Sequence, residues 1–95
     1  MLLKRGVPSA AIGYLQEAAE RFPAGALAVQ GEVRNHLAAA YEANDEADKA
    51  ISESQTCVDN YQTLAKGSKE QGVDLEEPAW AREARARLER LSEAS

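Results

Sequence analysis

Few side chains in this sequence could carry out catalysis. His36 is the only histidine and Cys57 the only cysteine among the 95 residues, and the spacing places no serine or cysteine beside His36 as in a catalytic triad. Cys57 lies on an apolar stripe without basic neighbours, which is typical of a buried thiol rather than a reactive one. With no nucleophile paired to a base, we expect no enzymatic activity and no catalytic residue.

The sequence also lacks the residue patterns of common metal and cofactor sites. A single histidine and a single cysteine cannot supply the four ligands of a zinc site. The acidic residues from Glu42 to Asp48 have neither the spacing nor the glycine of a calcium-binding loop, and Gly67 and Gly72 are not followed by the Lys-Ser/Thr pair of a phosphate-binding loop. We therefore expect no metal ligand and no cofactor.

Acidic residues are concentrated in the middle of the chain. The net charge of −5 arises from 16 acidic and 11 basic residues, and it argues against binding to nucleic acid or to an anionic membrane. Residues 35–77 alone carry ten acidic and three basic side chains, a local charge of −7. Such a run usually covers a solvated helix face; a docking surface for a basic partner is the alternative. The four arginines after Pro78 alternate with glutamates and predict a second solvated, salt-bridged face.

The sequence carries no membrane or export signal of the usual kind. No apolar run reaches the roughly 18 residues needed to span a bilayer. In the segment 1–5, charged residues directly follow a short apolar pair, unlike the apolar region of a signal peptide. A cytoplasmic location and no membrane partner are expected.

Apolar residues recur at helical spacing along nearly the whole chain, and no segment alternates as a strand would. Trp80 begins the apolar stripe of the last helix and is expected in the core. The segment 67–72, with two glycines and no apolar residue, predicts a loop. The stripes predict helices over about 9–22 (ended by Pro23), 29–44, 45–66 and 78–91.

An internal repeat accompanies these helices. An offset of 39 residues places Ala11 on Ala50, together with the isoleucine that follows each, and a repeat of this length with two helices is typical of an α-solenoid. The stretch RNHLAAAYEANDEADKAI resembles the tetratricopeptide repeat. Leu37 and Ala38 stand for the family's Leu-Gly pair, Tyr41 follows three residues later, and Ala50 lies nine residues beyond Tyr41.

The match to the family is incomplete. The offset is longer than the family's 34 residues, Arg34 occupies the tryptophan slot and Ser54 the phenylalanine slot. Even so, the resemblance implies an all-α fold: a right-handed superhelix of tandem antiparallel helix pairs, with about four helices and a C-terminal capping helix. One such domain would span residues 1–95. A turn at Gly6 would follow the end of an earlier helix, as in a fragment of a longer protein.

The resemblance also implies a function. Members of this family are scaffolds or adaptors that bind a peptide or partner helix in a concave groove without catalysis. In the register of the repeat, the expected partner-binding residues are Asn35, Glu42 and Arg85, and the partner is a protein or peptide. The chain would be a monomer or weakly self-associating. The alternatives are a structural segment that stacks on itself or within a larger protein, and a targeting appendage of a larger enzyme or regulator.

Overall fold

The computed structural model describes the backbone of residues 2–94 and the side chains of residues 10–93. The expected all-α fold with four helices is confirmed, and this part of the chain contains no strand. The helices are α1 (Leu2–Arg21), α2 (Leu27–Ala43), α3 (Ala47–Glu70) and α4 (Ala79–Ala94). None of the described helices is both long and apolar enough to cross a membrane.

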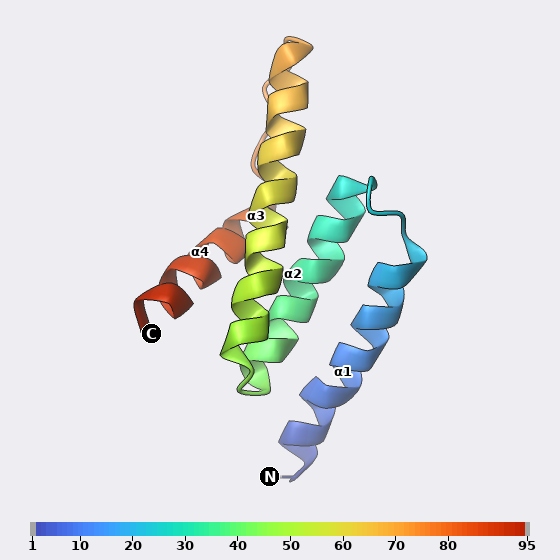
Figure 1. Ribbon diagram of the computed structural model, residues 1–95, viewed down its shortest axis with the longest axis vertical. Coiled ribbons are helices and arrows are strands. Elements are labelled where there is room, and N and C mark those ends of the chain that lie inside the picture. The colour runs from blue at the N-terminus through green and yellow to red at the C-terminus, as the bar shows by residue number, and fades with distance from the viewer. Residues whose placement is uncertain (1, 95) are drawn as a thin grey trace.

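The helices form a thin slab in which α2 is central. Successive helices α1, α2 and α3 run in alternating directions, and α4 crosses beside α3 (Figure 1). Helix α2 packs against α1, α3 and α4, whereas within the described residues α1 has no close backbone contact with α3 or α4. The Cα atoms extend over 50 × 32 × 17 Å. Because the slab is thin, few side chains can be fully buried.

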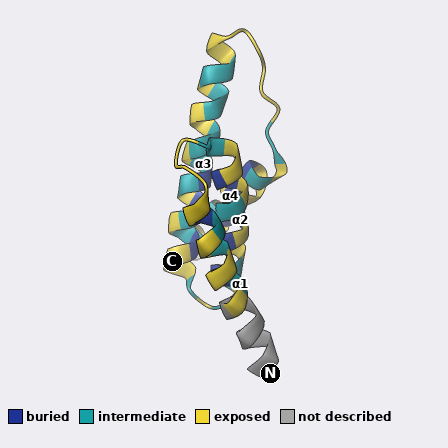
Figure 2. Cartoon of the chain, turned by 90° about the vertical axis from the view of Figure 1, so that its right-hand side faces the viewer, coloured by how far each residue is buried: buried dark blue, intermediate teal, exposed yellow. Residues whose placement is uncertain are grey.

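The core lies along α2 and is built largely from small residues. Leu37 and Tyr41 of α2 are buried beside Ala50 of α3, and Figure 2 shows the buried positions gathered in the middle of the helices. Ala38 and Ala84 are also fully enclosed. Small side chains let the helix axes approach closely, but each buries little apolar area and so contributes little hydrophobic stabilisation.

Helix α1 is tied to α2 at its C-terminal end. Pro23 ends the helix as predicted, and its carbonyl accepts a hydrogen bond of 3.0 Å from the Ala26 amide. The buried amide of Gln30 in α2 donates to the carbonyls of Ala19 and Phe22, both at 2.8 Å. These carbonyls lie at the end of α1, where no backbone partner follows, so Gln30 satisfies them from the neighbouring helix.

The expected starts of the first and third helices were wrong. The turn expected at Gly6 is absent, because α1 runs unbroken from Leu2; side chains before residue 10 lie outside the described part. The third helix was expected to begin at Asp45, but Asp45 has φ 60° and sits in the turn between α2 and α3. There the Glu46 amide donates to the Tyr41 carbonyl at 2.8 Å, which closes the end of α2 in a Schellman motif.

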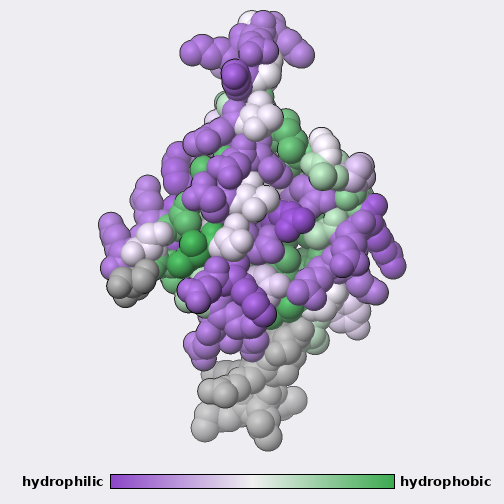
Figure 3. Space-filling view, viewed as in Figure 1, coloured by the Kyte–Doolittle hydropathy of each residue, from purple (hydrophilic) through white to green (hydrophobic). Residues whose placement is uncertain are grey.

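The loop expected over residues 67–72 is mostly helix. Helix α3 continues through Gly67 to Glu70 and projects beyond the other helices (Figure 1), where hydrophilic side chains cover it (Figure 3). Its end is set by Gly72, which has φ 79°, while the Val73 amide donates to the Ser68 carbonyl at 2.9 Å. A glycine inside a helix costs only about 1 kcal/mol, whereas the left-handed residue of this motif stops the helix.

Candidate functional site

The first turn of α4 is fixed by a close contact with α2. A β-carbon placed on Gly31 would lie 2.4 Å from a ring carbon of Trp80, so only glycine fits beneath the indole. On its other side the indole meets Tyr61 of α3 edge to face, with ring centroids 6.5 Å apart. Trp80 is partly buried, and it joins α4 to both α2 and α3.

Further along α4, Arg87 is buried in a polar network. Its side chain is only 7% exposed, and Nη1 donates to Asn35 Oδ1 at 2.8 Å and to Ser54 Oγ at 3.4 Å. Asn35 in turn donates from Nδ2 to Glu83 Oε1 at 2.9 Å. The buried network therefore holds the carboxylate of Glu83, whose side chain is exposed on α4, through the hydrogen bond from Asn35.

The same face of α2 also holds an ion-pair cluster at its C-terminal end. Both terminal nitrogens of Arg90, Nη1 and Nη2, donate to the Glu42 carboxylate, and Arg87 Nε lies 3.6 Å from Glu42 Oε1. The hydrogen bond from Arg90 holds the pKa of Glu42 below its usual value of 4.5; partial burial opposes this, and the positive charges of Arg90 and Arg87 add to it. Glu42 is thus held as an anion in a partly exposed ion-pair cluster.

The three expected partner-binding residues are not brought together. Asn35 and Glu42 are linked through Arg87, and Asn35, although only 3% exposed, is among the residues that line an open hollow beside this network. Arg85 lies elsewhere on α4, where its guanidinium bonds the Glu77 carboxylate at 2.6 and 3.0 Å. All three side chains have partners inside the chain, which leaves them poorly placed to recognise a ligand directly.

An open hollow lies next to this network, between α2 and the start of α4. It has a volume of about 470 Å³. Glu32, His36 and Glu83 at its walls are exposed. Neither Glu32 nor Glu83 is in an ion pair with any residue of the described part. The lining residues are Glu32, Asn35, His36, Pro78, Ala79, Trp80 and Glu83.

A second open hollow lies on the opposite side of α2, toward α1 and α3. Its volume is about 330 Å³. Arg34 Nη1 pairs with Glu53 Oε1 at 2.8 Å, and Gln16 Nε2 donates to the Tyr41 hydroxyl at 2.8 Å. Because four of the five polar side chains around it are already bound to other side chains of the described part, with Glu20 the exception, this hollow offers a ligand less than the hollow between α2 and α4.

Cys57 has a structural position. It is fully buried in α3, and its thiol donates to the Gly31 carbonyl at 3.3 Å. Burial, and secondarily the negative charge of Glu53, raises the pKa of the thiol to about 12, so very little thiolate exists at neutral pH. Within the described residues no group of three His, Cys, Asp or Glu side chains could hold a metal ion.

Sequence reasoning missed the role of Arg87. The four arginines of the last segment were expected to form a solvated face, and Arg85 and Arg90 do lie in exposed ion pairs. Arg87, however, follows Trp80 and Ala84 on the buried stripe of α4. Its position on that stripe, three residues after Ala84, was the signal that could have identified it.

Comparison with models of protein families, with curated proteins and with solved structures finds no match to this chain. The interpretation of the site therefore depends on its geometry and on the resemblance carried by the residues. The hollow between α2 and α4 joins a partly buried aromatic ring to two carboxylates that form no ion pair within the described residues. It is the strongest candidate for a binding site in the described part of the chain.

Proposed function

We propose that this chain is a non-catalytic protein–protein interaction module of the tetratricopeptide type, which binds a peptide or partner segment at the hollow between α2 and α4. The observation that carries the proposal is this hollow of about 470 Å³, whose exposed polar side chains surround Trp80. Concave sites that combine an aromatic surface with a few polar groups are those that proteins use for ligands. In this proposal the module is cytoplasmic and has neither a nucleic-acid nor a membrane partner.

The pattern of helix contacts supports a tandem-pair arrangement. Helix α2 packs against α3, its successor, and also against α4, while α1 has no close contact with α3 in the described part. This is the pattern expected if α2 and α4 are the first helices of consecutive pairs stacked in a right-handed superhelix. Their shared face would then line the concave side, and α4 would act as the capping helix.

The binding function is tested with a variant that partly fills the hollow. Ala79 lines it and is exposed, so Ala79→Gln adds bulk without charge; Ala86→Gln makes the same change at an exposed position of α4 outside the lining. Peptides are selected from a random-sequence library on the wild-type chain. Binding is then followed by the fluorescence of Trp80, the only tryptophan in the sequence. Selected peptides should lose affinity for Ala79→Gln alone; equal binding by both variants would refute the site.

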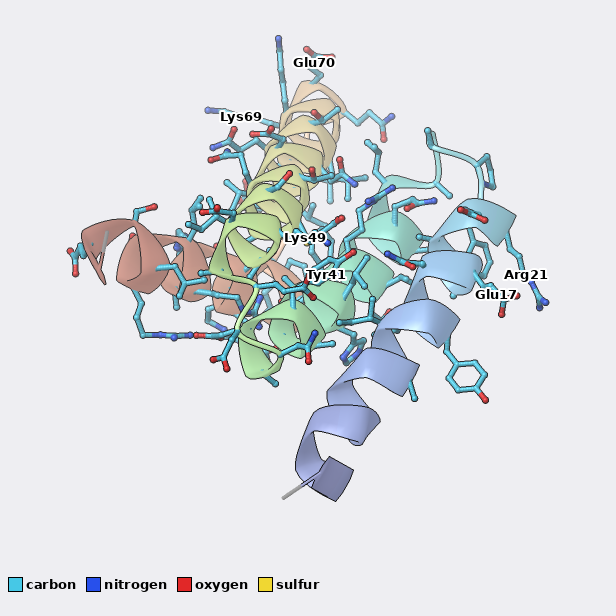
Figure 4. The ribbon with its side chains drawn as sticks, turned by 60° about the horizontal axis from the view of Figure 1, so that its bottom comes forward. Glu17, Arg21, Tyr41, Lys49, Lys69 and Glu70 are labelled. Atoms are coloured by element: carbon cyan, nitrogen blue, oxygen red, sulfur yellow. The ribbon has the colours of Figure 1, made fainter. Side chains whose placement is uncertain are left out.

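One observation favours self-association as a second function. Tyr14 on α1 is 74% exposed, beside an open hollow of about 450 Å³ that Ala10, Gly13 and Glu17 also line. Glu17 and Arg21 lie on the side of α1 remote from α3 and α4 (Figure 4). Sedimentation equilibrium of the wild type and of Tyr14→Ser tests this function. The wild-type chain should self-associate and the Tyr14→Ser variant should do so more weakly; a monomeric wild type, or equal association of the two, would refute it.

A further inference from the structure

We propose that the hollow between α2 and α4 accepts a lysine or arginine side chain from an extended segment of a partner protein. This inference rests on the proposed function and specifies its ligand. Two carboxylates line the hollow from different helices, Glu32 from α2 and Glu83 from α4. Both are exposed, and neither has a cationic partner among the described residues.

No arginine in the described part of the chain neutralises these carboxylates. Arg34, Arg85 and Arg90 are each paired with another glutamate, and Arg87 is buried against Asn35 and Ser54. Arg82 is exposed on α4 but is not among the residues that line the hollow. The hollow therefore keeps the charge of two carboxylates for an incoming group.

The N-terminal end of α4 repels a cation in the hollow, but more weakly than the two carboxylates attract it. The N-terminal end of a helix carries a partial positive charge of roughly half an elementary charge, and Ala79 at this end lines the hollow. Two full negative charges outweigh it. The free backbone N–H groups of a first helical turn can also bind a carbonyl oxygen of an extended peptide, which fits an occupant with a neutral backbone and a cationic side chain.

Glu83 and Trp80, two residues of the α4 wall of the hollow, are held in place before a ligand arrives. Asn35 Nδ2 holds Glu83 Oε1 at 2.9 Å, and Asn35 is itself held by the buried Arg87. Trp80 is fixed by Gly31 beneath it and Tyr61 beside it. A cation near an aromatic ring gains an additional attraction, and a guanidinium group can bond carboxylates in a bidentate manner. Pre-organised groups of this kind lower the entropic cost of binding.

Three capped peptides of equal length test the proposal: one alternates arginine with glycine, one glutamate with glycine, and one serine with glycine. Each is titrated at low ionic strength into the wild-type chain, and amide chemical shifts and the fluorescence of Trp80 are recorded. The same titrations use Glu32→Gln/Glu83→Gln, which removes both carboxylates with little change of shape. The matched control is Glu70→Gln/Glu89→Gln, which removes the same charge at exposed positions outside the hollow.

We expect the arginine peptide alone to shift the resonances of Glu32, Trp80 and Glu83, with an affinity about tenfold lower in the hollow variant than in the control. Equal weakening in the two variants would show attraction by net charge alone and overturn the proposal, as would unchanged binding in both. Binding of the glutamate or serine peptide at these residues would overturn the cationic ligand but keep the proposed function. If none of the peptides moves these resonances, both proposals fail.

Discussion

The indole of Trp80 lies directly over the backbone of Gly31, close enough that a single added methyl group would overlap the ring. This contact joins the fold to the candidate site, because Gly31 belongs to the central helix α2 and Trp80 lines the hollow. The position of α4, and with it the distance between the two walls, depends on the absence of a side chain at one residue.

Gly31→Ala should therefore destabilise the chain although alanine favours helix. The β-carbon would come within 2.4 Å of the Trp80 ring, and overpacking of this kind costs about 1–3 kcal/mol. Urea denaturation followed by circular dichroism measures the loss. Gly13→Ala is the matched control, since nothing lies within 4 Å of a β-carbon there, and it should stabilise by up to about 1 kcal/mol. Equal effects of the two substitutions would contradict the contact.

Arg87→Met should lower the free energy of unfolding by about 2–3 kcal/mol. It removes the donor that satisfies Asn35 Oδ1, which is buried and would be left without this bond. Arg82→Met makes the same change at an exposed position of α4 and should change stability by less than about 0.5 kcal/mol. Chemical denaturation measures the free energy of unfolding of both variants. Similar small losses in the two would mean that the buried network of Arg87 contributes nothing to stability.

The ion pair of Glu42 should make stability depend on pH. Because the hydrogen bond from Arg90 lowers the pKa of Glu42 in the folded chain, the unfolded chain binds this proton more readily. The stabilisation is thus present above the unfolded pKa and is lost as pH falls through the lower folded pKa. The difference in unfolding free energy between wild type and Glu42→Gln should be larger at neutral pH than below the usual value of 4.5. In an Arg90→Gln background this pH dependence should shrink; an unchanged pH dependence there would exclude Arg90 as its main cause.

The thiol of Cys57 should resist alkylation in the folded chain. Full burial blocks access, and a pKa of about 12 leaves almost no thiolate at neutral or mildly alkaline pH. Mass spectrometry after treatment with iodoacetamide should show slow labelling of the native chain and fast labelling in denaturant. Native labelling as fast as in the denaturant would contradict the buried position.

The residues that end α2 and α3 have the same left-handed backbone conformation, but only one of them is a glycine. Gly72 and Asp45 are both left-handed, with φ 79° and 60°, but only glycine adopts this conformation without cost. Gly72→Ala should destabilise the end of α3, and Asp45→Gly should stabilise the turn before α3, each by about 1 kcal/mol. Thermal unfolding of both variants tests this prediction. If the two substitutions changed the melting temperature in the same direction, the prediction would be refuted.

The fold could be predicted from the sequence where the signal is periodic or local. The stripe of Leu37, Ala38 and Tyr41 and the stop at Pro23 depend on spacing and on proline geometry alone, so the helices could be identified. The burial of Asn35 and Arg87 could not be deduced, because their partners lie on other helices and become neighbours only when α4 crosses α2. A glycine in a helix and a glycine that ends one, such as Gly67 and Gly72, also look alike until the backbone is known.

The one-sided packing of α1 has a consequence for partial unfolding. Since α1 packs closely only against α2 in the described part, its detachment breaks one interface and the hydrogen bonds of Gln30 while the contacts of α2 with α3 and α4 are retained. In such neighbour-to-neighbour packing, a helix held by a single interface opens at a lower cost in free energy than a helix held by several. The hollow, lined only by α2, α4 and the residue before α4, would persist in a state that has already lost its first helix.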